Sequence, residues 1–155
     1  MPSLTIRPAI LADEPFVTLI VEQAYGHYIE RIGRKPAPMT DNYIDYITAG
    51  QVWVLAQEQE QEQQLAGVIV LRSEPDHLLV SNVAVATAFQ GQGMGRRLLD
   101  FADEHARQQG LTELRLYTNE LMHENLLIYP KLGWQEYKRA EQDGFRRVYM
   151  RKYLQ

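Results

Sequence analysis

The stretch that decides the fold is Phe89–Leu98, FQGQGMGRRL, just past the middle of a chain of 155 residues. It holds three glycines within five residues, and Arg96 and Arg97 follow them directly. Glycine loses more conformational freedom on folding than any other residue, so such a run needs a structural or functional reason. The glycines alone fit two interpretations equally well: a tight turn after a strand, and a backbone cradle for an anion.

Two common phosphate-binding loops do not match this stretch. A P-loop needs a lysine and a hydroxyl residue after its last glycine, and here two arginines occupy those places. A dinucleotide-binding loop has the spacing G-x-G-x-x-G, whereas the glycines here are spaced G-x-G-x-G. A third interpretation is a strand that ends at Ala86 and a helix that begins near Gly95, whose N-terminal amides bind pyrophosphate. A glycine turn without a ligand remains the alternative.

The composition is that of an ordinary globular protein, with 45% hydrophobic and 23% charged residues. Its length predicts a single domain, residues 1–155. A formal net charge of −4 argues against a nucleic-acid-binding protein. We find no signal peptide and no membrane-spanning stretch, so we expect a cytoplasmic protein that binds no membrane. The chain has no cysteine, which excludes disulfides and thiol chemistry, and we predict no metal site.

Hydrophobic periodicity and turn residues predict the elements of a mixed α/β chain. The predicted strands are 3–9, 51–57, 64–73, 77–86, 113–118, 134–140 and 146–154. The predicted helices are 13–25, with Asp13 as N-cap, 95–109, and 121–132, with Asn119 as N-cap. The buried stripe predicted for the first helix is Phe16, Leu19, Ile20, Gln23 and Ala24. The polar run Glu58–Gln64 predicts a solvated hairpin loop.

In this setting the stretch resembles the acyl-CoA loop of the GNAT N-acetyltransferase superfamily. Gln90–Gly95, QGQGMG, is similar to the family pattern Gln/Arg-x-x-Gly-x-Gly/Ala, and it lies between a predicted strand and a predicted amphipathic helix, as in that family. Tyr129–Trp134, YPKLGW, resembles the family's Tyr-x-x-x-Gly-Phe signature. The order of predicted elements resembles the GNAT fold over essentially the whole chain.

The resemblance implies a mixed central sheet of about six to seven strands, splayed between the fourth and the fifth, with about four flanking helices. The pantetheine arm of acetyl-CoA then lies between strands 77–86 and 113–118. By similarity, Val83, Ala84 and Val85 offer backbone groups to pantetheine and to the acetyl carbonyl. The amides of residues 91–96 hold the pyrophosphate. The implied loop residues are Gln90, Gly91, Gln92, Gly93, Met94, Gly95 and, as an added cation, Arg96.

The implied reaction is transfer of the acetyl group to a primary amine by direct attack in a ternary complex. Tyr129 matches the family's acid, which protonates the departing thiolate, and a tyrosine with a pKa near ~10 carries that proton at neutral pH. A half-buried core position is the alternative for Tyr129. Many members carry a cofactor-contacting Asn where this chain has Met122. Asn125, one helical turn before Tyr129, is the candidate to replace it, and a surface role is its alternative.

No base stands out in the sequence. Glu120, at the end of the fifth strand, is the first candidate, against two alternatives: an acid placed at a helix N-terminus, and a chain of water molecules that leads to bulk solvent. The segment 24–39, AYGHYIERIGRKPAPM, is expected to cover the acceptor groove, with Tyr25, Tyr28, Arg31 and Arg34 as candidate contacts. A mobile lid with its tyrosines packed down is the alternative for this segment.

The expected acceptor is an amine of a small molecule or a peptide, and the closing strands suggest a homodimer. Two other functions fit the same residues: a non-catalytic module that binds or senses acyl-CoA, and a nucleotide-binding protein.

Overall fold

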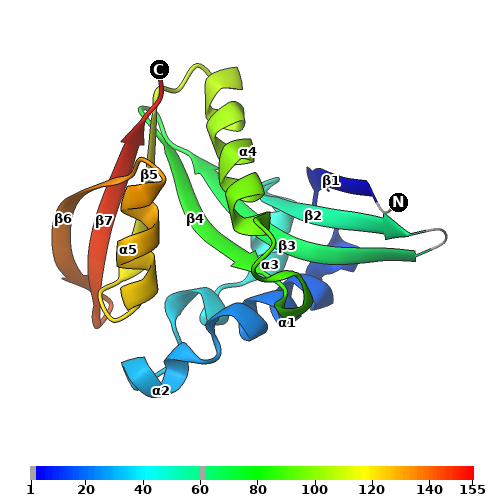
Figure 1. The fold of residues 1–155 in the computed structure, drawn as a ribbon, viewed down its shortest axis with the longest axis horizontal. Helices are drawn as coiled ribbons and strands as arrows, with labels where there is room; N and C mark the ends of the chain where they lie inside the picture. Colours follow the sequence, from blue (N-terminus) through cyan, green and yellow to red (C-terminus); the bar gives the residue numbers. More distant parts are fainter. Residues whose placement is uncertain (1–2, 60–61) are drawn as a thin grey trace. The chain divides into compact units, whose positions relative to one another are not determined.

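The computed structural model describes residues 3–59 and 62–155. Its seven strands form one mixed sheet in the order β1-β2-β3-β4-β5-β7-β6 (Figure 1). The strands are β1 (Ser3–Pro8), β2 (Val52–Gln59), β3 (Glu62–Ser73), β4 (Leu78–Val85), β5 (Glu113–Asn119), β6 (Gln135–Gln142) and β7 (Phe145–Tyr153). β4 and β5 pair in parallel, and the pairs β1/β2, β2/β3, β5/β7 and β6/β7 are antiparallel. The predicted mixed sheet is confirmed.

The described residues also form five α-helices, where about four were expected. They are α1 (Glu14–Tyr25), α2 (Tyr28–Ile32), α3 (Tyr43–Thr48), α4 (Met94–Gln108) and α5 (His123–Lys131). Three short 3-10 helices join them: η1 (Leu11–Asp13), η2 (Ala37–Thr40) and η3 (Thr87–Phe89). None of the helices in the described part of the chain combines the length and the apolar composition that crossing a bilayer requires.

The chain divides into two compact units. Unit 1 comprises the described residues of Met1–Leu71 and Asn82–Phe101, and unit 2 comprises Arg72–Ser81 and Ala102–Gln155. In unit 1, β2 pairs with both β1 and β3. In unit 2, β7 lies between β5 and β6, and a two-residue turn at Asp143 and Gly144, both with positive φ, joins the last two strands.

The first helix buries only part of the predicted stripe: Ile20 is buried as expected, but two valines outside the stripe are buried with it. Val17, Ile20 and Val21 are at most 4% exposed, whereas Phe16 and Leu19 are 58% and 50% exposed. The prediction of a buried Phe16 and Leu19 is therefore wrong. Both faces of this helix carry apolar residues at helical spacing, and the face with Val17 and Val21 is the one that is buried.

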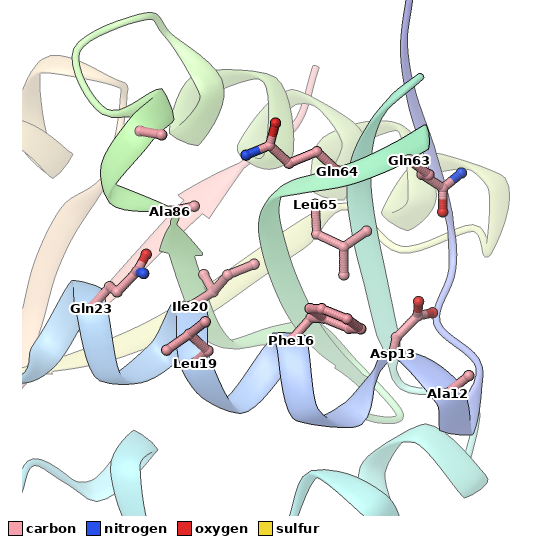
Figure 2. A pocket seen from close by; sticks show the side chains of 11 residues that line it. Ala12, Asp13, Phe16, Leu19, Ile20, Gln23, Gln63, Gln64, Leu65 and Ala86 are labelled. Atoms are coloured by element: carbon pink, nitrogen blue, oxygen red, sulfur yellow. The ribbon is translucent and has the colours of Figure 1, made fainter. Parts of the chain in front are cut away.

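Phe16 and Leu19 instead line an open cavity of about 460 Å³ in unit 1. Figure 2 shows these side chains with Ile20 and Gln23 along α1, facing Gln64 and Leu65 of β3. The wall is completed by Ala86 and other small or polar side chains.

Asp13 precedes α1 as predicted, but its carboxylate does not cap the helix. It accepts two hydrogen bonds from the Arg7 guanidinium, at 2.8 and 3.0 Å, and one from the backbone N–H of Ile10 at 2.8 Å. The hydrogen bonds from Arg7 are the main cause that lowers the pKa of Asp13, against the opposing effect of burial. The carboxylate thus ties β1 to the start of α1.

Two further local predictions need correction. The polar run that begins at Glu58 continues the strands, because Glu58 pairs with Gln63 and Gln59 with Glu62, so the described residues of the predicted loop are strand. Residues 60–61 of that predicted loop lie outside the described residues. Asn119 ends β5 and is not the N-cap of α5, which is Met122. The side chain of Asn119 accepts the N–H of Leu121 at 2.9 Å and so turns the chain before the helix.

Candidate functional site

The glycine loop of unit 1 leads from η3 into α4. Gly91 and Gly93 have φ angles of 78° and 80°, a left-handed conformation that favours glycine. A Cβ at either glycine would meet no atom within 4 Å, so the backbone there faces open space. The first helical hydrogen bond of α4 joins the N–H of Arg97 to the carbonyl of Gly93 at 3.1 Å. The preceding amides therefore lie at a helix N-terminus, where the peptide dipoles favour an anion.

Two glutamine side chains of this loop hydrogen-bond to the chain that precedes it. The amide of Gln90 donates to the carbonyl of Val85 at 3.2 Å, and that of Gln92 donates to the carbonyl of Ala88 at 3.4 Å. Met94 is buried and anchors the start of α4, while Arg96 is exposed. The side chains of Gln90, Gln92 and Met94 thus fix the loop, while the backbone at Gly91 and Gly93 stays accessible.

The end of β4 presents alternate backbone groups to opposite edges of the strand. The N–H of Ala86 donates to the carbonyl of Ala66 in β3 at 2.8 Å, so the backbone of Ala84 and Ala86 faces β3. The backbone of Val83 and Val85 then faces the other edge. Within unit 2 and among the described residues, β4 pairs in parallel with β5 at two positions near the start of each strand, Leu78↔Leu114 and Leu79↔Arg115.

A buried polar residue in β4, Asn82, was missed in the sequence. It is 4% exposed, and its amide nitrogen donates to the hydroxyl of Tyr43 at 2.8 Å. The hydroxyl of Tyr25 lies 2.8 Å from Asn82 Oδ1 and 3.0 Å from the carbonyl of Val83. The alternating pattern of the strand could have identified it. The buried face of β4 consists of Leu78, Val80, Asn82 and Ala84, and Asn82 is its polar residue.

Tyr43 extends this network to the segment that the sequence assigned to the acceptor. Its hydroxyl donates to the carbonyl of Pro38 at 2.6 Å. Burial raises the pKa of Tyr43 above its ordinary value, and nearby Asp41 raises it further, so the hydroxyl keeps its proton. Pro38 in η2 is thereby tied to the middle of β4 within unit 1.

The four predicted acceptor contacts have different surroundings. Tyr25 is half-buried and reaches β4 through its hydroxyl. Tyr28 is 7% exposed, and its ring lies beside His27 and under the guanidinium of Arg31, which stands 5.1 Å from the ring centroid. Arg31 and Arg34 are exposed at the end of α2 and in the loop after it. The buried Tyr28 ring therefore packs against the Arg31 guanidinium in a cation–π contact.

Three predicted residues, Tyr129, Asn125 and Glu120, lie in unit 2. Tyr129 is half-buried in the last turn of α5, before Pro130, and its ring packs edge-on against Trp134. Trp134 is 3% exposed, so it fixes one side of the Tyr129 ring.

Asn125 lies on α5 with its amide turned toward β5. The amide donates to the hydroxyl of Thr118 at 3.0 Å and lies 3.7 Å from the sulfur of Met122. Glu120 follows β5, where its backbone N–H donates to the carbonyl of Arg146 at 2.9 Å. Its carboxylate forms an ion pair with the Arg146 guanidinium at 3.2 Å.

The comparisons with known proteins agree with this geometry. The model of the acetyltransferase (GNAT) domain matches residues 48–136. The mouse protein N-alpha-acetyltransferase 80 is 40% identical over 62 residues, which cover 40% of this chain and 18% of that protein. The rat protein N-acetyltransferase 8B is 25% identical over 126 residues, which cover 79% of this chain and 56% of that protein. The chain thus spans 18% and 56% of the length of these two curated relatives.

Among solved structures, a GNAT family acetyltransferase from Elizabethkingia anophelis with acetyl-CoA bound has the same fold. Its TM-score is 0.70 at 19% identity, with 97% of this chain and 98% of that chain covered. The family model covers more than half of the sequence and includes the glycine loop that leads into α4. The chain belongs to the GNAT acetyltransferase family.

Proposed function

We propose that the protein is an acetyl-CoA-dependent N-acetyltransferase. The observation that carries this proposal is the loop 90–96, in which two left-handed glycines face open space at the N-terminus of α4. Membership of the GNAT family and the N-acetyltransferase names of the relatives support it. The donor would supply a thioester-activated acetyl group, and the protein would position it.

The loop and the free edge of β4 fit such a cofactor. The open space above Gly91 and Gly93 admits a pyrophosphate to the amides of residues 91–96, and exposed Arg96 adds a positive charge. The carbonyl of Val85 already accepts the Gln90 amide, which leaves Val83 and Val85 to offer N–H groups along that edge. The backbone of Ala84 faces β3, so Ala84 is not kept as a backbone contact to the donor, and Asn125 is the proposed polar contact from α5.

The chemistry assigned to the side chains is acid–base catalysis of direct attack in a ternary complex. Tyr129 donates its phenolic proton to the departing thiolate. Glu120, or a chain of water molecules, takes the proton that the amine must lose. The acceptor is a primary amine of a small molecule or a peptide, bound along Tyr25, Arg31 and Arg34, with Tyr28 beneath. We further propose that residues 1–155 act as one cytoplasmic domain, as a homodimer, without nucleic-acid or membrane partners.

Calorimetry with acetyl-CoA, followed by thiol release with a panel of amines, tests this proposal. The panel holds benzylamine, tyramine, spermidine and the tripeptide Ala-Ala-Ala. Thiol release is a clean readout because the protein has no cysteine. We expect acetyl-CoA binding and amine-dependent release. Binding without release from any amine would favour a non-catalytic acyl-CoA-binding module. Tight binding of ATP or NAD, with none of acetyl-CoA, would favour the nucleotide-binding alternative.

A further inference from the structure

The carbonyl of Pro38 sets the orientation of the Asn82 carboxamide. A carbonyl only accepts hydrogen bonds, so the Tyr43 hydroxyl must give its hydrogen to Pro38, at 2.6 Å. The oxygen of Tyr43 then accepts, and it needs the Asn82 NH₂ group, which lies 2.8 Å away. The carboxamide oxygen of Asn82 consequently faces Tyr25.

Tyr25 has one hydroxyl hydrogen for two acceptors. Its oxygen lies 2.8 Å from Asn82 Oδ1 and 3.0 Å from the Val83 carbonyl, and neither of these can donate. When Tyr25 donates its hydrogen fully to one of these acceptors, the other acceptor receives no hydrogen from Tyr25. An acceptor buried without a donor is costly, and Asn82 is 4% exposed. Val83 is only half-buried, so the hydrogen goes to the more deeply buried acceptor, Asn82, and the Val83 carbonyl is left in excess.

The Val83 carbonyl faces the edge of β4 that turns away from β3, because the backbone of Ala86 bonds to Ala66. This is the edge whose N–H groups are proposed to hold the donor. The Val83 carbonyl can therefore accept a hydrogen bond from a ligand that carries N–H groups, and a primary amine is such a ligand.

We propose that the Val83 carbonyl binds an N–H of the attacking amine, and that Asn82 is the positioning residue that keeps this carbonyl available. Asn82 acts through Tyr25: it draws the tyrosine hydrogen away from Val83. The inference rests on the proposed N-acetyltransferase function. In this inference, residues of unit 1 select the primary amine. They act through a chain of hydrogen bonds that runs from Pro38 through Tyr43 and Asn82 to Tyr25.

Asn82→Leu and the double variant Asn82→Leu/Tyr25→Phe test the inference. In Asn82→Leu, Tyr25 has lost its other acceptor and gives its hydrogen to Val83, so we expect KM for the best amine of the panel to rise about tenfold. The dissociation constant of acetyl-CoA should stay unchanged. The double variant keeps the Tyr25 ring, which is the part proposed to line the acceptor site, and removes only the competing hydrogen, so the amine KM should fall back toward the wild-type value. If Asn82 had only a structural role, the amine KM of the double variant would be at least as high as that of Asn82→Leu.

Asn42→Leu is the matched control, because Asn42 also makes a structural hydrogen bond in unit 1, accepting the N–H of Asp45 at 3.2 Å. We expect lower stability and an unchanged amine KM. If Asn82→Leu does not fold, Asn82→Ala takes its place in both backgrounds. An amine KM that does not rise in the single variant, or that the second substitution fails to restore, overturns the inference.

A second readout separates this inference from the proposed function. The same amines are added during thermal unfolding, without acetyl-CoA, and the shift in Tm is compared among the variants. We expect a shift in the wild type, loss of the shift in Asn82→Leu and its return in the double variant. If every amine gives the same Tm shift in the wild type, the single variant and the double variant, the inference is overturned, even when the wild type acetylates an amine. Absence of thiol release overturns the proposed function, whatever the Tm shifts.

Discussion

The ring of Tyr129 stands edge-on against that of Trp134, with centroids 5.9 Å apart and an angle of 72° between the planes. A phenylalanine at position 129 preserves this contact, because the contact involves the ring and not the hydroxyl. We therefore expect Tyr129→Phe to fold normally, to bind acetyl-CoA with unchanged affinity and to lose about 100-fold in kcat, as for removal of a general acid.

Steady-state thiol release and calorimetry measure the two quantities for Tyr129→Phe. Tyr153→Phe, which loses a hydroxyl from a residue 54% exposed on β7, is the matched control and should leave kcat unchanged. A Tyr129→Phe enzyme with wild-type kcat would show that the hydroxyl has no role in the reaction.

Gly93 and Gly50 form a natural pair for testing the loop. Both have positive φ, 80° and 73°, and a Cβ at either would meet nothing within 4 Å. Alanine should therefore destabilise each variant by about 1–2 kcal/mol, through backbone strain alone. Only Gly93→Ala should also weaken acetyl-CoA binding, because its methyl group enters the space proposed for the pyrophosphate. Equal acetyl-CoA affinities for the two variants would refute that placement.

Arg96 is exposed in the first turn of α4 and is proposed to contact an anion. We expect Arg96→Ala to reduce acetyl-CoA affinity several-fold at low ionic strength, and the difference from wild type to shrink as salt is added. Arg107→Ala, which removes an exposed arginine from the last turn of the same helix, serves as the control. A loss of affinity that does not depend on salt would argue against an electrostatic contact.

The pair of Arg7 and Asp13 predicts a specific response to acid. Because the native pKa of Asp13 is lowered, chiefly by Arg7, the pair stabilises the fold above the unfolded aspartate pKa of about 3.9. This stabilisation is lost as the pH falls below that value, through the native pKa. Asp13→Asn should cost about 1–2 kcal/mol near neutral pH and progressively less in acid. Urea unfolding at several pH values measures both curves, and parallel curves would contradict the prediction.

Phe16 and Val17 are neighbours on α1 with opposite environments, 58% and 0% exposed. Val17→Ala should lower the free energy of unfolding by about 2 kcal/mol, because it removes buried methyl groups and leaves a cavity. Phe16→Ala should change it by less than about 0.5 kcal/mol. Chemical denaturation of the two variants gives both values, and the reverse order would restore the original sequence prediction.

Much of the fold follows from the sequence because its signals are local. The strand at Leu78–Val85 and the helix after the glycine loop depend on nearby residues and were predicted. The buried face of α1 was predicted only in part, at Ile20, because both candidate faces are apolar and tertiary packing chooses between them. Asn119 was misassigned as an N-cap because its side chain bonds to the nearest available N–H, that of Leu121.

For the candidate site, the glycine loop was predictable because its motif is contiguous. The network of Tyr25, Tyr43 and Asn82 joins positions 57 and 39 residues apart, and no local pattern connects them. The importance of Asn82 becomes clear only from its partners. The roles of Tyr129, Glu120 and Arg96 stay predictions.

The chain crosses between its two units after Leu71, after Ser81 and after Phe101, so each unit is built from separated pieces of sequence. No single breakpoint in gene recombination can exchange one unit between relatives without cutting the other. A breakpoint after Phe101 would separate the proposed donor loop from the proposed acid, and it would leave Arg72–Ser81 of unit 2 with the other parent. A clean exchange of unit 2 between relatives therefore needs a breakpoint at each of the three crossings.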